Sequence, residues 1–271
     1  MTRQAPLTKL GMSFNAARPF EFRELKAAGV HCVELNCRTL DIRKAEVLAK
    51  FEQWTREAEQ AEIELWSYHL PYSTGWDPSV LDPAGREAAI ENVGYVIERC
   101  AEWGVSTLVY HPSFEPISDA DRAERLLRCG ETLRVLADRA ARYQITIAVE
   151  CLPRTCLGNG SDEMLQLMEA DERLMVCCDV NHLFKEPASQ FIRKLGSRLR
   201  STHLSDHDGT DEKHWVPGEG VICWPDVIEA LAAVDYQGPL MYEVRDQSID
   251  QVVANWRGFM NGMLSLHGKG A

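Results

Sequence analysis

Six short apolar runs in this sequence end on a carboxylate or an imidazole. The final residues of the runs are His69, His111, Glu150, Asp179, His203 and Glu243. A buried strand is ordinarily followed by turn-forming residues, so six endings of this kind are unusual. Carboxylates and imidazoles bind divalent metals and transfer protons. The pattern therefore predicts a site at which one edge of a sheet gathers these side chains.

Four of the six endings form an oxygen-rich set of three carboxylates and one imidazole. They are Glu150, Asp179, His203 and Glu243. Such a set suits one divalent metal, with Mn²⁺ as the first expectation and Mg²⁺, Co²⁺ or Zn²⁺ as alternatives. For any one carboxylate taken alone, a salt bridge or hydrogen bonds to strand-end amides are the alternative explanation. For all four together a metal is favoured, because desolvating three carboxylates without a cation is very costly.

Four histidines form a second group of candidates. They are His69, His111, His182 and His214. His182 follows Asp179 by three residues, so its imidazole can contact a substrate or hold a second metal beside the first. For His69 and His111, a supporting hydrogen bond is the alternative to direct ligation. We expect these four side chains to bind substrate, with a second metal site as the alternative.

The loop at 206–220 follows the run 199–203 and is too long for a bare connection. Long loops beside strand ends are commonly functional. Glu219 lies between two glycines and argues against a strong phosphate site there. We expect Trp215 to line a sugar pocket, with core packing as the alternative, and His207 to be a solvated loop residue. Arg154, four residues after Glu150, is expected to hold a substrate oxygen, with a surface ion pair as the alternative.

Strand-like and helix-like patterns alternate along the whole chain. Strands are predicted at 10–15, 32–36, 63–69, 107–111, 145–150, 174–179, 199–203 and 240–244. Most are short and apolar on both faces, as in a covered parallel sheet. The segments 86–103, 119–143 and 249–264 repeat apolar residues at helical spacing. Before the first of them, Asp82 and Pro83 supply an N-cap and a first-turn proline.

Eight strands alternating with about eight helices predict an α/β protein with one (β/α)₈ TIM barrel domain over residues 1–271. An open doubly wound sheet is the alternative, but the first predicted turn, at 13–19, lacks the glycines typical of that fold. Catalytic residues of a TIM barrel lie at the C-terminal ends of its strands. The barrel therefore brings the six endings to one face.

The composition disfavours several classes of protein. With 29 basic and 41 acidic residues, the formal charge of −12 argues against nucleic acid as a partner. The nine cysteines lie mostly in apolar runs and indicate reduced thiols. The sequence shows neither a signal peptide nor an apolar stretch of the ~20 residues that span a bilayer. We expect a cytoplasmic protein without a membrane partner; whether it forms homo-oligomers is left open.

Four motifs together resemble one known superfamily. They are Glu150-Cys-Leu-Pro-Arg-Thr, Asp179-Val-Asn-His182, His203-Leu-Ser-Asp206 with the segment 214–220, and Tyr242-Glu243. In this order and spacing the chain resembles the xylose-isomerase-like barrels. That superfamily groups sugar isomerases and epimerases with apurinic-site nucleases of the endonuclease IV type. The motifs look most like its sugar phosphate isomerase/epimerase branch.

The resemblance implies a metal-dependent sugar enzyme. In ketose 3-epimerases, residues matching Glu150, Asp179, His203 and Glu243 hold one divalent metal, and the two glutamates serve as acid and base. The residue matching His182 contacts substrate oxygens. The implied reaction is isomerisation or epimerisation of a small polyhydroxy carbonyl compound, by proton transfer through an enediolate. Dehydration of a sugar acid or inositol derivative begins with the same proton abstraction and is a related alternative.

The endonuclease IV resemblance implies the main alternative, phosphodiester hydrolysis with several zinc ions. There, three zincs are held by residues resembling both histidine and carboxylate candidates, together with an Asp-x-His pair. The nearest equivalent of that pair is Glu212 and His214, so Asp is replaced by Glu or displaced. This substitution and the acidic charge disfavour the nuclease. A metal- or sugar-binding barrel without catalysis is the remaining alternative, and it is disfavoured because both candidate bases, Glu150 and Glu243, are present.

Overall fold

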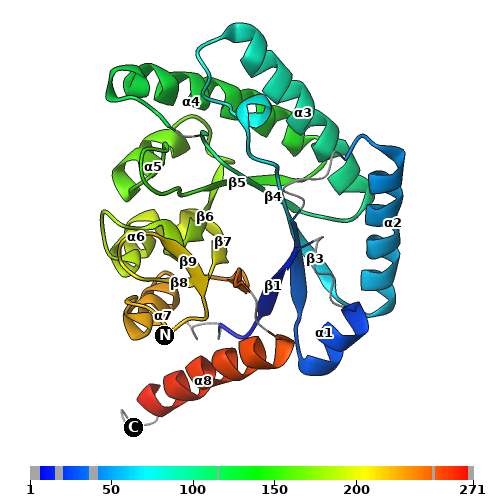
Figure 1. The fold of residues 1–271 in the computed structure, drawn as a ribbon, viewed down its shortest axis with the longest axis vertical. Helices are drawn as coiled ribbons and strands as arrows, with labels where there is room; N and C mark the ends of the chain where they lie inside the picture. Colours follow the sequence, from blue (N-terminus) through cyan, green and yellow to red (C-terminus); the bar gives the residue numbers. More distant parts are fainter. Residues whose placement is uncertain (1–6, 16–20, 37–41, 115, 246–247, 268–271) are drawn as a thin grey trace.

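The computed structural model describes residues 7–15, 21–36, 42–114, 116–245 and 248–267. Within them, a central parallel sheet is formed by β1 (Leu10–Asn15), β2 (Cys32–Asn36), β3 (Glu64–His69), β4 (Thr107–Tyr110), β5 (Thr146–Glu150), β6 (Met175–Asp179), β7 (Leu199–His203) and β10 (Leu240–Tyr242). The helices that follow the strands are α1 (Phe22–Ala28), α2 (Ala45–Gln60), α3 (Pro83–Glu102), α4 (Asp119–Ala141), α5 (Ser161–Met168), α6 (Ala188–Leu195), α7 (Trp224–Ala233) and α8 (Ile249–His267). Figure 1 shows the helices surrounding the strands.

The sheet closes into a barrel, as the alternation of strands and helices predicts. The strands are hydrogen-bonded in the order β10-β1-β2-β3-β4-β5-β6-β7. Closure between the two outer strands is made by one parallel bridge between Leu204 and Tyr242. The amide of Leu204 donates to Met241 O at 2.7 Å, and the amide of Glu243 donates back to Leu204 O at 3.3 Å. The open doubly wound alternative is therefore wrong, since the strands follow one another around a nearly closed barrel.

Strand alternation separates a helix-facing layer from a polar barrel interior. Tyr68 in β3 packs against Phe51 of α2 and Trp103 after α3, with ring centroids 5.6 and 6.1 Å apart. Its neighbours Ser67 and His69 lie on the opposite face of β3. Both are buried, and each hydrogen-bonds to a buried carboxylate of another strand. The same alternation that builds the apolar core thus turns polar side chains toward the barrel axis.

Local signals set the helix and strand boundaries. The Asp82 carboxylate accepts from the amide of Gly85 at 2.9 Å, and Pro83 opens α3, as predicted. Two strands end earlier than predicted: β4 ends at Tyr110 and β10 at Tyr242, so His111 and Glu243 lie one residue beyond their strands. The eight cysteines among the described residues are free thiols. None of the helices in the described ranges has the length and apolar character needed to cross a membrane.

The segment after β7 folds into a hairpin of β8 (Asp206–His207) and β9 (Glu212–Trp215). The buried Asp206 carboxylate anchors it by accepting from the amides of Gly218 and Ile222, at 2.9 and 3.2 Å, and from Trp224 Nε1 at 2.8 Å. Only glycine fits at position 220, because a Cβ there would lie 2.2 Å from His207 O. The amides of the glycine-rich turn therefore donate hydrogen bonds to the Asp206 carboxylate of the same chain.

Candidate active site

The C-terminal ends of the strands bring the predicted ligands together at one face. Among the described residues, three groups of candidate metal ligands share this face. They involve β3 to β7, the hairpin and the residue after β10. The residues concerned are His69, His111, Glu150, Asp179, His182, His203, Glu212, His214 and Glu243. In each group, one ligand atom from every member lies within 4.8 Å of the others. The sequence argument that one barrel face collects these side chains agrees with this geometry.

The first group consists of the four residues predicted to hold one metal. His203 Nδ1 lies 3.2 Å from Glu150 Oε1 and 3.2 Å from Glu243 Oε2. Asp179 Oδ2 lies 3.8 Å from the same nitrogen and 3.3 Å from His182 Nδ1, is buried, and accepts no hydrogen bond. A buried carboxylate oxygen without a donor is costly unless a cation neutralises it. The donor set and this unsatisfied oxygen therefore fit a divalent metal.

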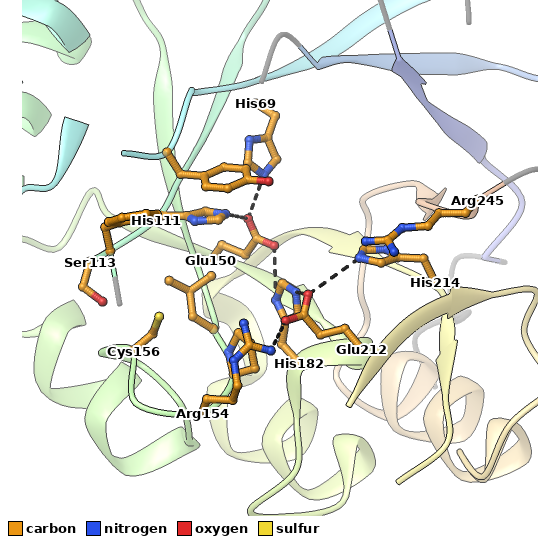
Figure 2. A pocket seen from close by; sticks show the side chains of 14 residues that line it. His69, His111, Ser113, Glu150, Arg154, Cys156, His182, Glu212, His214 and Arg245 are labelled. Atoms are coloured by element: carbon orange, nitrogen blue, oxygen red, sulfur yellow. Dashed lines mark hydrogen bonds and ion pairs between the residues drawn. The ribbon is translucent and has the colours of Figure 1, made fainter. Parts of the chain in front are cut away.

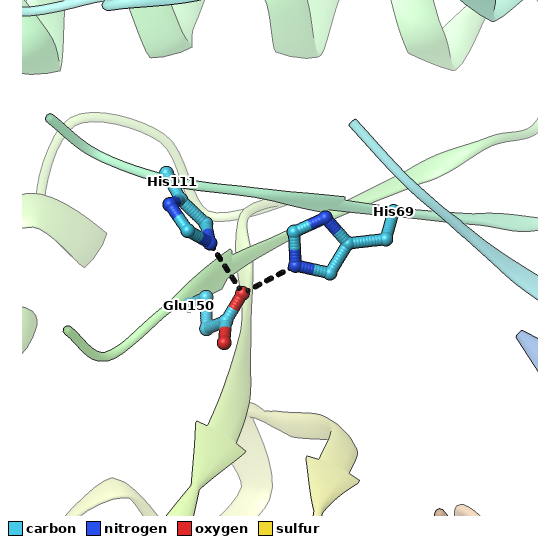
Figure 3. A group of neighbouring side chains, drawn as sticks. All are labelled: His69, His111 and Glu150. Atoms are coloured by element: carbon cyan, nitrogen blue, oxygen red, sulfur yellow. Dashed lines mark hydrogen bonds and ion pairs between the residues drawn. The ribbon is translucent and has the colours of Figure 1, made fainter. Parts of the chain in front are cut away.

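The second group uses the other oxygen of Glu150. Its Oε2 lies 3.0 Å from Nε2 of His69 and 3.0 Å from Nε2 of His111, and Figure 3 shows the two imidazoles converging on this one atom. Tyr72 covers His111, with the rings stacked at 4.8 Å. Glu150 thus belongs to both groups and links them.

The third group lies across the cavity, where the hairpin meets β6 (Figure 2). Glu212 Oε2 is 3.3 Å from His182 Nε2 and 3.8 Å from His214 Nε2. The guanidinium of Arg154 also pairs with Glu212 and lies 3.1 Å from Asp211 Oδ1. Both Arg154 and His214 have left-handed backbones, with φ of +52° and +53°. Such non-glycine conformations are strained and persist where the surrounding contacts impose them.

The outer nitrogens of three histidines are fixed by backbone carbonyls. Nδ1 of His69 lies 2.8 Å from Leu70 O, Nδ1 of His182 lies 3.0 Å from Cys151 O, and Nδ1 of His214 lies 3.0 Å from Glu243 O. A carbonyl only accepts, so each Nδ1 carries the proton. In the neutral ring Nε2 is then a bare lone pair aimed at a carboxylate. That arrangement is favourable only when the ring is protonated or when a cation lies between nitrogen and oxygen.

In the metal-free site, burial and the neighbouring carboxylates shift the pKa values of the histidines in opposite directions. Burial lowers the pKa of His182, but Asp179, Glu212 and Glu150 outweigh it and raise the pKa to about 10. The same balance of burial against neighbouring carboxylates raises the pKa values of His69 and His203. Burial disfavours the charged form of Glu150, yet the surrounding imidazoles hold its pKa well below the usual range. Without a metal, protonated His69, His182 and His203 therefore balance the carboxylates of the site, whereas burial lowers the pKa of His111.

Metal binding is consequently expected to release protons. At pH 7 the His182 ring is expected to be charged in the metal-free protein, because its pKa of about 10 lies well above 7. A cation at Nε2 must displace that proton, so metal affinity should rise with pH through this range. Calorimetric titration with Zn²⁺ or Mn²⁺ in buffers of different ionisation enthalpy measures the release. The His182→Asn variant should release fewer protons and His31→Asn as many as wild type; a heat independent of buffer would contradict the expectation.

A cavity of about 160 Å³ opens above the groups. Of the six predicted substrate-binding residues, five line it: His69, His111, Arg154, His182 and His214. Trp215 is absent from the wall among the described residues and is 38% exposed. The strand period explains the difference, because the buried His214 precedes it in β9 and adjacent side chains face opposite sides. The expectation for His207 is wrong: it is 6% exposed and lies against the ring of Phe184.

Sequence reasoning missed several residues of the site. Tyr72, Phe114 and Arg245 line the cavity, and they come from loops whose course the strand pattern does not predict. Glu34 in β2 is fully buried and contacts His203 Nε2 at 3.0 Å. The available signal was a carboxylate inside the apolar run Cys-Val-Glu-Leu-Asn, two residues before the strand end. The pattern of strand-final residues does not include Glu34, because Glu34 lies inside its strand.

Comparison with known proteins identifies the barrel. The sequence profile of the xylose isomerase-like TIM barrel family matches residues 22–261. This chain belongs to that family. Family members and structural neighbours include sugar epimerases, and one neighbour is a crystal structure of a D-tagatose 3-epimerase-like protein. It superposes with a TM-score of 0.83 at 21% identity, covering 96% of this chain and 99% of the other.

The curated relatives with a named activity include sugar epimerases and a probable endonuclease. Fructoselysine 3-epimerase of Escherichia coli O157:H7 is 34% identical over 118 residues, which are 41% of this chain and 42% of that protein. A probable endonuclease 4 of Nitratidesulfovibrio vulgaris is 29% identical over 108 residues, 38% of each chain. Relatives from Methanocaldococcus jannaschii and Sinorhizobium fredii are matched over 53–65% of their lengths. The chain thus spans only part of the length of these curated relatives, and its family membership rests on the profile match over residues 22–261.

Proposed function

We propose that this chain is a divalent-metal-dependent epimerase or isomerase of a small sugar or sugar-derived ketone. The observation that carries the proposal is the first ligand group. Two glutamates approach His203 Nδ1 at 3.2 Å each, beside the unsatisfied oxygen of Asp179. When bound, a divalent cation there supplies a Lewis acid that polarises a carbonyl and acidifies the neighbouring C–H bond. Mn²⁺ is the metal that we expect first, since three of the four ligands are carboxylates.

The protein's own residues then move the proton. Glu150 lines the cavity and is ionised, so it is the candidate base on that side. Glu243, the residue after β10, approaches Nδ1 of His203. It is the candidate partner that returns a proton. His182 and His214, held by backbone carbonyls, present Nε2 toward the cavity and orient substrate oxygens. The buried floor of the site excludes water from the carbon that loses its proton.

The relatives support a sugar as the substrate. Fructoselysine 3-epimerase and 3-dehydro-D-guloside 4-epimerase, both from Escherichia coli strains, act on sugar derivatives by name and share 34% and 27% identity with this chain over their matched segments. The histidine and arginine side chains around the cavity are donors suited to hydroxyl and carbonyl oxygens. We therefore expect a polyhydroxy carbonyl compound in the cavity.

Solvent-exchange measurements test the proposed function. The Mn²⁺-loaded protein, incubated in D₂O with a panel of ketohexoses, ketopentoses and 3-keto sugars, should incorporate deuterium at the carbon next to the carbonyl of one or more of them. Proton and carbon NMR detect the incorporation and the new epimer together. The Glu186→Gln variant, whose carboxylate accepts from Ser161 at the start of α5, is the matched control and should behave as wild type. Absence of exchange across the panel, with metal bound, would contradict the epimerase.

A second candidate is supported by the second and third ligand groups. The Nε2 atoms of four histidines face two carboxylates, and this arrangement suits two further metals beside the first. Several metals spaced in this way serve phosphodiester hydrolysis, the activity named for the endonuclease 4 relative. Elemental analysis of the purified protein separates the two functions. One Mn-like ion supports the epimerase, whereas two or three Zn ions with cleavage of an abasic-site duplex support the hydrolase.

A further inference from the structure

A buried carboxylate lies one layer below the candidate ligands. Glu34 is in β2, paired with Ser67 of β3 at a register shift next to Val33. Its side chain is fully buried, and Ser67 Oγ donates to Oε2 at 2.7 Å. Ser13 Oγ in β1 donates more weakly to Oε1, at 3.4 Å. Three neighbouring strands therefore fix this carboxylate in the barrel interior.

The third contact of Glu34 is the ring of His203. Nε2 of His203 lies 3.0 Å from Oε1 and 3.1 Å from Oε2 of Glu34, and both residues are inaccessible to solvent. The other ring nitrogen, Nδ1, faces Glu150 and Glu243 on the opposite side. Glu34 thus lies behind the imidazole and is separated by it from the ligand oxygens of the first group.

We propose that Glu34 is a positioning residue that holds His203 with Nε2–H toward the barrel floor and Nδ1 bare toward the metal. The role rests on His203 being a metal ligand, as in the proposed function. A carboxylate accepts the Nε2 proton, so in the neutral ring the lone pair is left on Nδ1. Loss of the carboxylate removes the contact that selects this orientation, and the ring can then turn or protonate on the wrong nitrogen. A hydrogen-bonded partner of this kind also raises the basicity of a ligating imidazole.

Ser67 supports the position of Glu34. Its hydroxyl donates to the Glu34 oxygen that also faces Nε2, and strand alternation places it directly below His69. Ser67→Ala keeps the carboxylate but removes one of its donors. The effect of this change should therefore be smaller than that of changing Glu34 itself.

Metal affinity of the full-length protein tests the role without relying on turnover. Competition with a chromophoric chelator gives the Zn²⁺ Kd of each variant. We expect about a tenfold weaker Kd in Glu34→Gln, which keeps an acceptor, and about a hundredfold weaker Kd in Glu34→Ala. Asp77→Asn is the matched control, because this buried carboxylate contacts Ser79 and Arg125 and no residue of the three ligand groups. Its Kd should equal that of wild type.

A spectroscopic signature separates positioning from a general loss of packing. In the Zn²⁺-loaded wild type, the His203 Nε2 proton should give a slowly exchanging downfield ¹⁵N-coupled ring signal, assigned by its absence in His203→Asn. The signal should shift in Glu34→Gln and vanish in Glu34→Ala, while Asp77→Asn keeps it. An unchanged signal, or a Kd that Asp77→Asn weakens equally, overturns the role. Tight binding by wild type and both Glu34 variants overturns this inference alone, whereas no binding by wild type overturns it together with the metal-dependent function.

Discussion

Replacing Glu150 with glutamine is expected to reduce turnover by at least the 10²–10⁴-fold that a general acid or base contributes. The reason is that one carboxylate serves two ligand groups. Its Oε1 lies 3.2 Å from His203 Nδ1, and its Oε2 lies 3.0 Å from both His69 and His111. Glutamine keeps the size but loses the charge, so both groups lose their shared anion. Turnover at saturating substrate and metal content by elemental analysis measure the two losses together.

The Glu150→Gln variant also changes the metal-free protein. The charge of Glu150 is the first of the carboxylate effects that raise the pKa of His69 against burial. Without it, burial prevails, and the His69 pKa should fall, which NMR titration of the ring detects. Glu186→Gln should leave turnover, metal content and this titration unchanged. Wild-type turnover in Glu150→Gln would remove Glu150 from the proposed mechanism.

The strand pattern was sufficient to predict the fold, for a physical reason. In a parallel barrel every strand is covered by helices, so each strand appears as an apolar run bounded by a helical pattern. The predicted strands at 10–15, 32–36 and 199–203 match β1, β2 and β7 in both bounds. The predicted ends of β4 and β10 lie too far along the chain, because the apolar runs lead on to His111 and Glu243 after the strands have ended at Tyr110 and Tyr242. A strand ends where its backbone hydrogen bonds to the neighbouring strand stop, and residue type gives no direct signal of that point.

The site was only partly predictable, because strand ends define a single layer. His69, Glu150, Asp179 and His203 end their strands, so the barrel alone brings them together. Glu34 belongs to the layer below and needs the register of β2 against β3 to be located. Glu212 and His214 are placed by a hairpin whose geometry depends on the Asp206 anchor and on strained backbone at His214. These features depend on tertiary contacts that the spacing of apolar residues does not contain.

Replacing Glu243 with glutamine is expected to stop epimerisation as fully as the Glu150 change, but with a smaller loss of metal. Glu243 belongs to the first ligand group only, through Oε2 at 3.2 Å from His203 Nδ1. The groups formed by His69, His111 and Glu150, and by His182, Glu212 and His214, stay complete in this variant. Metal titration should therefore show a smaller weakening of metal binding in Glu243→Gln than in Glu150→Gln.

The two variants together test whether the glutamates act from opposite sides of the substrate. If each carboxylate serves one epimer, each variant at saturating metal should still exchange the proton of one epimer with D₂O without forming the other. Glu150→Gln and Glu243→Gln should then retain exchange on opposite epimers, which NMR of each purified epimer distinguishes. Retained exchange on the same epimer in both variants would assign the chemistry to a single base. Full epimerisation by Glu243→Gln would exclude Glu243 as the acid, since its amide cannot return a proton at the required rate.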